Sequence, residues 1–272
     1  MRGRVVQTGW KPTASQASDT RPLPYWAFGV IVVVYLAIIQ LGGIALTHVG
    51  DHDDTVASVE GVLWNMWLPL GAAFVFTYAV IGVLGWWRPV FREDRPVRRW
   101  VWFVPIVFLV CTLIAIDYGA LGDKTITYVL LLFIATQFVG WGEEGMFRGI
   151  GVTTLRSHGL TEGKVALWSS AVFGAVHLSN AAGHGAQAIP QALAVSFAGY
   201  FFYLTRRVSG SNVVNSILHG LFDFALLSGT VILVDQTPYV GSVAAIFAYF
   251  VVGAVLLVRR RKIEPAAAAT SN

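Results

Sequence analysis

Six ionisable side chains stand within or beside apolar stretches at spacings that could support chemistry. The first three lie in the segment WGEEGMFRGI, where the adjacent carboxylates Glu143 and Glu144 are followed four residues later by Arg148. Carboxylates at membrane depth are costly and usually face a bundle interior or a wet cavity. We expect Glu144 and Arg148, as i,i+4 helix partners, to neutralise each other. Adjacent helical residues point about 100° apart, so we expect Glu143 to serve a different point and to be free for another task.

Two later apolar stretches each hold a histidine with a partner on the same helix face. FGAVH places Phe173 and His177 at i,i+4, and HGLFD places His219 and Asp223 at the same spacing, with Asn215 one turn upstream. A lone helical histidine is more often a hydrogen-bonded core residue than a ligand. Two such pairs near the glutamates favour a joint site.

Depth along the helices tests whether these residues can meet. Both histidines lie about 18–20 Å from the nearest basic residue at the loop that precedes their stretch. Glu143 reaches a similar depth only if its helix continues past Arg148, through the uncharged segment GIGVTTL, to about Arg156. We therefore expect that continuation, and a submerged Arg148 that needs its acidic partner.

One carboxylate and two imidazoles at a common depth suit the activation of water. A positioned glutamate can act as a general base, and a neighbouring histidine can share the proton or orient the water. His219 and Asp223 would then face the developing oxyanion or complete a metal site, since glutamate and histidine are good zinc ligands. Spacing alone leaves both routes open. The sequence contains no HExxH zinc-protease signature and no GxSxG nucleophile elbow.

The composition is that of an integral membrane protein. The chain of 272 residues is 56% hydrophobic and only 12% charged, whereas about 25% charged residues is normal for a soluble domain. Its mean hydropathy is +0.64. The single cysteine, Cys111, excludes an intramolecular disulfide framework and a zinc site of several thiolates.

The charge pattern fits eight transmembrane helices. Apolar runs close to the ~20 residues that a crossing helix needs occur at about 26–47, 60–87, 100–117, 126–147, 165–182, 187–205, 212–234 and 239–258. With this count, all of the 19 basic residues except Lys124 fall in tails and loops on one side. Because Lys and Arg collect in cytoplasmic loops, we expect the N-terminus and the C-terminus in the cytoplasm.

We therefore predict an all-α, polytopic integral membrane protein in five parts. These are a disordered cytoplasmic tail at 1–24, three N-terminal transmembrane helices at 25–125, a catalytic core at 126–234, a last transmembrane helix with its basic end at 235–262, and a disordered tail at 263–272. Arginine outnumbers lysine fifteen to four, and alanine, valine and glycine are abundant. This composition favours a GC-rich bacterium, so we expect the bacterial cell (plasma) membrane.

The three motifs together resemble those of a known enzyme family. EEGMFR, FGAVH and HGLFD resemble, in order and spacing, the EExxxR, FxxxH and HxxxN/D motifs of the CAAX-protease and bacteriocin-processing family, also called CPBP or Abi. The resemblance covers about residues 126–230. It implies an eight-helix intramembrane endopeptidase with a catalytic cavity open to the cytosol. In eukaryotic members the substrates are prenylated CAAX tails.

The resemblance also implies roles for individual residues. Glu143 and His177 correspond to the water-activating pair, and Glu144 and Arg148 to a structural ion pair. The group at 219 and 223 corresponds to the part of the site that stabilises the oxyanion or completes a metal site.

Asp223 departs from the commonest family pattern, because many relatives have asparagine there. An ionised aspartate cannot donate a hydrogen bond to an oxyanion. Asp223 must therefore be protonated, orient His219, or bind metal, and this tilts the prediction slightly toward metal. Zinc is a candidate cofactor, with Glu143, His177, His219 and Asp223 as candidate ligands, and a metal-free mechanism stays open.

We expect a peptide or protein substrate, membrane-anchored substrates included, together with the lipid bilayer and no nucleic acid. The same residues suggest two other functions. An ion- or proton-coupled transporter could use the same buried acids and histidines as a relay, but they gather in one patch and no inverted repeat is visible. A non-catalytic membrane immunity protein would carry a decayed site, whereas the three motifs here are intact.

Overall fold

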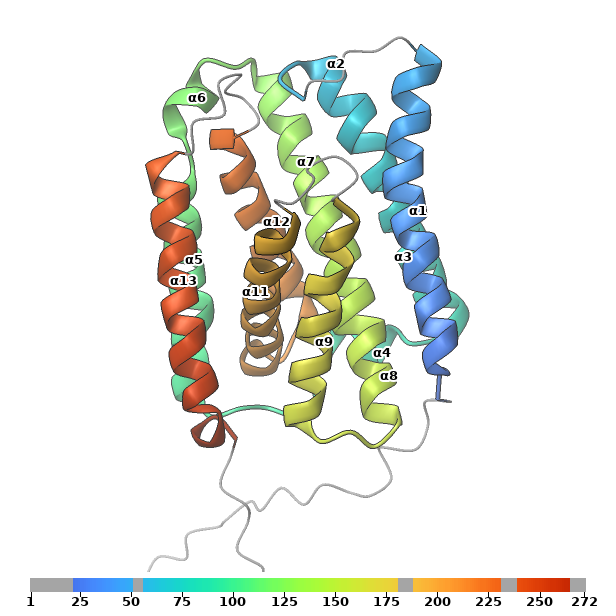
Figure 1. The fold of residues 1–272 in the computed structure, drawn as a ribbon, viewed down its shortest axis with the longest axis vertical. Helices are drawn as coiled ribbons and strands as arrows, with labels where there is room; N and C mark the ends of the chain where they lie inside the picture. The colour runs from blue at the N-terminus through green and yellow to red at the C-terminus, as the bar shows by residue number, and fades with distance from the viewer. Residues whose placement is uncertain (1–21, 51–55, 181–187, 231–238, 265–272) are drawn as a thin grey trace, which may run out of the picture.

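The computed structural model describes residues 22–50, 56–180, 188–230 and 239–264, which form helices joined by short connections (Figure 1). The described residues contain no β-strand, and their one extended pairing is an isolated bridge between Arg92 and Ser211. The all-α prediction is therefore confirmed. Nearly all of the tail predicted at 1–24 lies outside the described residues.

Helical runs occupy every stretch predicted to be an apolar span (Figure 1). They are α1 (Tyr25–Gly50); α2 (Val59–Val62), η1 (Leu63–Trp67) and α3 (Leu68–Leu84); η2 (Arg99–Trp102) and α5 (Phe103–Ala115); α7 (Ile126–Glu143), η3 (Glu144–Gly151) and α8 (Val152–Ser157); α9 (Glu162–Val176) and η4 (His177–Asn180); α11 (Ala188–Ser209); α12 (Asn212–Thr230); and α13 (Val240–Val258). Shorter pieces are α4 (Trp87–Phe91), α6 (Tyr118–Gly122) and η6 (Arg260–Lys262). Of the η segments, η1 and η3 are π-helical.

Four helices among the described residues are long and apolar enough to cross a membrane. They are Tyr25–Leu46, Val59–Leu84, Ile126–Ser157 and Val240–Val258, and Arg99–Ala115 is a shorter apolar helix. The chain is therefore a multi-pass membrane protein. The count of eight spans and the cytoplasmic orientation of the termini stay predictions.

The loops fall into two groups at opposite ends of the bundle, as the charge pattern predicts. At one end, Arg156 lies 2.9 Å from Glu93 and 2.7 Å from Glu162, which joins the loop after α4 to the end of α8 and the start of α9. At the other end, the Lys124 ammonium group donates to the carbonyl oxygen of Ala57 at 2.7 Å. The basic loops therefore share one end of the molecule.

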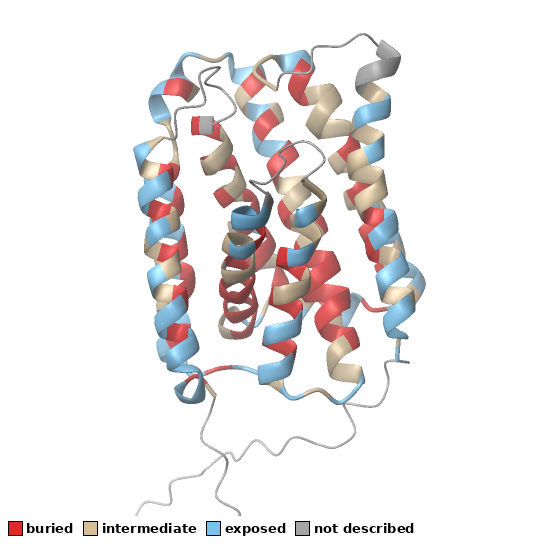
Figure 2. Cartoon of the chain, in the orientation of Figure 1, coloured by how far each residue is buried: buried red, intermediate tan, exposed pale blue. Residues whose placement is uncertain are grey.

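Buried residues gather on the inner helices rather than on the outer ones. Figure 2 shows buried positions concentrated along α11, α12 and the middle of the α7–η3–α8 run, whereas α1 and α13 expose one face. The inner core is rich in aromatic rings, namely Phe108, Phe201, Phe202, Phe222 and Tyr249. Apolar outer helices thus shield inner helices that carry more polar side chains.

Small residues let the inner helices approach closely. A Cβ added at Gly140 of α7 would lie 2.4 Å from the backbone nitrogen of Gly220 in α12. A Cβ added at Gly174 of α9 would likewise lie 2.5 Å from the carbonyl oxygen of Ala192 in α11. Because no side chain separates the backbones, as is common in membrane bundles, α7 and α12 bring their polar residues within direct reach of each other.

Two boundaries differ from the prediction. The run predicted to continue to residue 87 ends at Leu84, because Gly85 takes a left-handed conformation with φ of 67°. The disordered tail was predicted at 263–272, but its first two residues pack against the bundle, and residues 265–272 lie outside the described residues. Ile263 is 2% exposed, and the Glu264 carboxylate lies 2.6 Å from the Arg207 guanidinium.

Candidate active site

The fourth run of helix continues inward, and this continuation places the two glutamates. The helical segment extends from Ile126 to Ser157, so the prediction that it continues to about Arg156 is confirmed. Its hydrogen bonding changes from α to π at Glu144. π-Helical turns inside α-helices are frequent at functional sites. Glu143 and Glu144 therefore stand at the junction of α7 and η3, near the middle of the bundle.

The carboxylate of Glu144 is buried and accepts hydrogen bonds from three side chains. Arg148 Nη1 lies 2.9 Å and His219 Nδ1 2.8 Å from Glu144 Oε1, and Asn215 Nδ2 donates to Oε2. Asn212 Nδ2 also donates to the Glu144 backbone carbonyl at 2.9 Å. The side chains of Glu144 and Arg148 are both 0% exposed. The predicted ion pair is present, and Glu144 has more partners than the sequence indicated.

His219 stands between the two glutamates. Its Nδ1 lies 2.8 Å from Glu144 Oε1, while its Nε2 lies 3.7 Å from Glu143 Oε2 and 3.5 Å from Asp223 Oδ2. The adjacent glutamates therefore approach two different atoms of one side chain. The imidazole has two nitrogens on opposite sides of its ring, and each nitrogen faces one of the glutamates.

Aromatic rings hold the charged groups from the sides. The Arg148 guanidinium lies 3.9 Å from the centroid of the Phe173 ring and 5.2 Å from that of Phe202. Phe202, on α11, stacks on His219 with centroids 4.2 Å apart and an interplanar angle of 20°. These cation–π and stacking contacts restrict Arg148 and His219 to one arrangement.

His177 lies at the end of α9, where the helix tightens into the 3₁₀ turn η4. Its Nδ1 lies 2.8 Å from the carbonyl oxygen of Phe173, which leaves Nε2 for another partner. The Phe173 ring is 5.0 Å from the His177 ring and 5.9 Å from the His219 ring. The structure therefore brings the two imidazoles near one aromatic ring. The described residues include no hydrogen bond or ion pair between His177 and Glu143.

Exposure separates the acids into two kinds. The Glu144 side chain is 0% exposed, whereas those of Glu143 and Asp223 are 14% and 23% exposed. Glu143 Oε2 is a buried atom without a hydrogen-bond partner, so it can accept a hydrogen bond from a water molecule. Glu143 and Asp223 are therefore the carboxylates that a water molecule or a substrate could reach.

The side chains predicted as metal ligands do not form a metal centre in this arrangement. Within the described residues, no group of three or more His, Cys, Asp or Glu side chains is placed to hold a metal ion. The His219 Nδ1 is occupied by Glu144 and the His177 Nδ1 by a backbone carbonyl. Such contacts also orient histidines in zinc sites, and the carboxylates of Glu143 and Asp223 lie 3.7 and 3.5 Å from the His219 Nε2. Zinc binding by these four residues stays a prediction.

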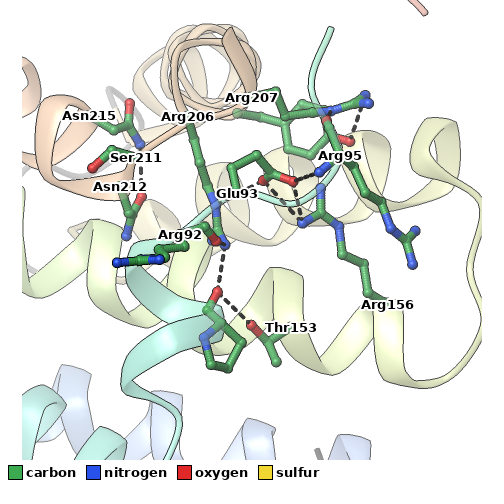
Figure 3. Close-up of polar contacts among 12 residues, drawn as sticks. Arg92, Glu93, Arg95, Thr153, Arg156, Arg206, Arg207, Ser211, Asn212 and Asn215 are labelled. Carbon is green, nitrogen blue, oxygen red and sulfur yellow. Dashed lines mark hydrogen bonds and ion pairs between the residues drawn. The ribbon is translucent and has the colours of Figure 1, made fainter. Parts of the chain in front are cut away.

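A network of ion pairs fixes the end of the bundle below the site (Figure 3). Arg206, only 1% exposed, lies 3.1 Å from Glu93 and donates to the Pro89 carbonyl at 2.7 Å. Arg156 joins Glu93 to Glu162. The chain turns from α11 into α12 beside this network, so the network also fixes the helix that carries Asn212, Asn215 and His219.

Glu162 contacts several of the arginines in this network. Burial alone would raise the pKa of its carboxyl, but hydrogen bonds from Arg156 and Tyr203 and the charges of Arg156 and Arg207 lower the pKa to about 2. The carboxylate is thus ionised at any ordinary pH, and the charged network persists with it.

Several residues around the site could not be identified as site residues from the sequence. Asn212 lies outside the three motifs, and Asn215 was recognised only as part of the His219 face. Tyr35, in α1, is 1% exposed, and its hydroxyl lies 3.1 Å from the position of a Cβ added at Gly142. Phe202 belongs to an apolar helix in which any ring could have been core. Only packing between distant helices identifies these contacts.

The fold and the site can be compared with those of known protein families. A multi-pass, all-helical membrane protein carries an acid–imidazole cluster whose side chains come from the α7–η3 junction, the end of α9 and the middle of α12. Residues 125–225 match the family model described as type II CAAX prenyl endopeptidase Rce1-like. The match agrees with the resemblance to the CAAX-protease family and covers the chain from α7 into α12. No curated protein and no solved structure gives a significant match.

Proposed function

We propose that the protein is an intramembrane endopeptidase that hydrolyses a peptide bond with water activated at Glu143. The family match supports a protease in general terms. The observation that carries the proposal is the contrast between the two glutamates. Glu144 is sealed within a network of hydrogen bonds, whereas Glu143 is partly exposed and has an oxygen without a hydrogen-bond partner, 3.7 Å from His219.

Glu143 acts as the general base in this proposal. It removes a proton from a water molecule held between it and His177, and the water oxygen attacks the carbonyl carbon of the scissile peptide bond. His177 presents its free Nε2 to that water, because Nδ1 is occupied by the Phe173 carbonyl. The proton then passes from Glu143 to the leaving amine nitrogen as the carbon–nitrogen bond breaks. Water is thus divided between the new carboxyl and amino termini.

His219 stabilises the charge that develops on the carbonyl oxygen. Since the Glu144 carboxylate can only accept, His219 donates to it through Nδ1. In the imidazolium form, Nε2–H donates to the oxyanion, and Asp223, 3.5 Å away, holds the ring in position. A preorganised donor of this kind is typically worth about 10²–10³ in rate. Every step uses side chains of this chain, so the proposed mechanism is metal-free.

The proposed substrate is a membrane-anchored peptide or protein whose scissile segment reaches the bundle interior. On the proposed topology, the basic loops and both termini face the cytoplasm, and the substrate enters from that side. A prenylated C-terminal tail is the first substrate to test, since the matched family model is described by that activity. The proposed location is a bacterial plasma membrane.

The test compares Glu143→Gln with Asp94→Asn, a matched acid-to-amide change at an exposed loop position. Both variants are purified in detergent and assayed for cleavage of a prenylated reporter peptide and a library of membrane-anchored peptides. We expect Glu143→Gln to unfold at a temperature close to that of the wild type and to lose cleavage, while Asp94→Asn retains it. Equal cleavage by Glu143→Gln and wild type would refute the assignment. Loss of ion flux in liposomes, with no cleavage by either protein, would favour the transporter.

Metal content distinguishes the mechanisms. We expect less than one zinc per ten purified molecules and cleavage that survives a chelator. Stoichiometric zinc, with cleavage lost on chelation and restored by zinc, would overturn the metal-free proposal but leave the protease assignment intact.

A further inference from the structure

A groove runs along the outside of the bundle between α9 and α13, with α11 as its floor. Its volume is about 790 Å³. The walls and floor are mainly apolar, and they include Ala166, Leu167, Ala171, Phe197, Leu204 and Leu257. Leu167 and Leu257 are 63% and 38% exposed. Since apolar side chains of α9 and α13 face outward here, the groove opens toward the hydrocarbon of the bilayer. We call it the α9–α13 groove.

Arginines lie at one end of this groove. Arg260 and Arg261, in the short helix η6 after α13, line the groove together with Arg207 at the end of α11. Arg260 and Arg261 are exposed at the surface. Lipid-facing apolar surface thus meets guanidinium groups at the end of the bundle where the basic loops gather.

The acids at the mouth do not neutralise these two arginines. Glu162 is bound by Arg156 at 2.7 Å and by Tyr203 at 2.5 Å. Both carboxylate oxygens of Glu264 are bound by Arg207, at 2.6 and 2.9 Å. Arg260 Nη1 donates to the Leu257 carbonyl, which leaves its other guanidinium nitrogens available. The mouth therefore keeps a net positive charge from Arg260 and Arg261.

A buried polar atom on the groove wall needs a partner. The hydroxyl of Ser170 lines the groove, the residue is 8% exposed, and its Oγ has no hydrogen-bond partner. It lies two helical turns from Glu162, or about 12 Å from the mouth. A ligand with a polar head, a polar linkage and an apolar chain would match the arginines, this hydroxyl and the apolar floor in turn.

We propose that the α9–α13 groove binds an anionic phospholipid, with its phosphate on Arg260 and Arg261 and an acyl chain along α11. Basic pockets between transmembrane helices on the cytoplasmic side bind anionic lipid headgroups. The bound lipid braces α9 against α11 and α13. These helices carry Phe173, His177 and Phe202, so lipid occupancy supports the helices of the proposed site. The proposal does not depend on the reaction that the site performs.

A second groove offers an internal comparison. It lies between α1, α8 and α9, has a volume of about 840 Å³, and is also mainly apolar. Its lining contains one cation, Lys164, and no arginine. If apolar shape alone held lipid, both grooves would bind neutral and anionic lipids alike. The paired arginines therefore predict a headgroup preference at the α9–α13 groove alone.

The experiment measures lipid binding to the full-length protein by native mass spectrometry. Phosphatidylglycerol and phosphatidylcholine with identical chains are titrated separately, and inorganic phosphate is the competitor. We expect the wild type to prefer phosphatidylglycerol. Arg260→Gln/Arg261→Gln should reduce that preference roughly 10- to 30-fold, at about 1 kcal/mol for each arginine. The control is Arg259→Gln/Lys262→Gln, which removes the same charge from flanking residues that do not line the groove.

The outcomes separate the explanations. Retention of the preference in the control and its loss in Arg260→Gln/Arg261→Gln supports the groove site. Equal loss in both variants shows a general surface-charge effect and overturns it, as does a wild type without preference. Displacement of lipid by millimolar phosphate also overturns it, because the groove would then contribute nothing. If Arg260→Gln/Arg261→Gln fails to fold, Arg261→Gln against Arg259→Gln gives the same comparison, with about a fivefold loss expected.

Discussion

Removing the charge of Glu144 is the most informative perturbation, because this carboxylate belongs both to the folded core and to the proposed site. It accepts hydrogen bonds from Arg148, Asn215 and His219 and is fully buried. Sequence alone assigns it only to the ion pair, and predicts that its loss affects folding more than chemistry. The contact with His219 predicts that its loss affects both.

The magnitude follows from the groups left behind. Breaking a buried pair by removing one partner typically costs about 3–5 kcal/mol. Arg148 already has two guanidinium nitrogens, Nε and Nη2, without hydrogen-bond partners, so it has no alternative acceptor. Glu144→Ala would also strand Asn215 and His219 at about 1–3 kcal/mol each, which approaches the total stability of a domain. Glu144→Gln, which keeps the shape and one acceptor oxygen, is the better probe.

A second substitution separates the two roles. Replacing a buried pair by apolar groups is often neutral or stabilising, and a methionine at 148 can pack against Phe173. We expect Glu144→Gln/Arg148→Met to recover about 3 kcal/mol relative to Glu144→Gln, or roughly 6–12 °C in Tm. Both variants should remain inactive, because His219 has lost the carboxylate that orients it.

Thermal unfolding in detergent and peptide cleavage measure the two effects on the same samples, with Asp94→Asn as the control for a lost surface acid. Three results would each contradict the reasoning. They are a Tm of Glu144→Gln within about 2 °C of the wild type, no recovery in the double variant, and full cleavage by either variant.

Three further predictions concern other parts of the molecule. Asp223→Asn should retain cleavage at neutral pH, while Asp223→Ala should lose up to about 10²–10³ in rate, which is the contribution of the oxyanion donor His219 that Asp223 holds in position. Near-wild-type cleavage by Asp223→Ala would remove the residue from the site. Gly140→Ala should fold poorly, since its Cβ would lie 2.4 Å from the backbone of α12. The control is Gly163→Ala, because a Cβ added there meets nothing within 4 Å. Its Tm should match that of the wild type. Folding lowers the pKa of Glu162 from 4.5 to about 2. The ionised carboxylate therefore stabilises the folded protein fully above pH 4.5, and this contribution declines as pH falls toward 2. The Tm difference between wild type and Glu162→Gln should narrow from pH 6 to pH 3, and a constant difference would contradict the assignment.

Helix positions were predictable because they depend on local properties of the chain. Apolar runs located the helices, and the uncharged segment after Arg148 correctly predicted that the helix would continue. The pairing of Glu144 with Arg148 was also accessible, since i,i+4 spacing and the cost of a lone buried charge both require it. The ends of helices and of the folded chain were harder to predict. Gly85 stops a helix inside an apolar run, and Ile263 is buried although the composition around it is typical of a disordered tail.

Contacts between helices far apart in sequence were not predictable in this way. Asn215 and Phe202 touch Glu144 and His219 only because α11 and α12 pack against α7 and α9 at particular rotations. The glycines that allow the close approach were visible in the sequence, but a glycine in a membrane helix does not identify its partner. The change from α to π hydrogen bonding at Glu144 is likewise set by packing.

The arrangement around His219 explains how two adjacent glutamates can have different roles. The two side chains leave the helix in different directions, and each reaches a different nitrogen of the same ring. Glu144 is closed off by Arg148 and Asn215 and can only orient the ring. Glu143 remains partly exposed with one free oxygen and can exchange a proton with water. Exchanging the two environments would leave an exposed acid bound to arginine and a sealed base without access to water, so the order of the pair along the helix is part of the proposed mechanism.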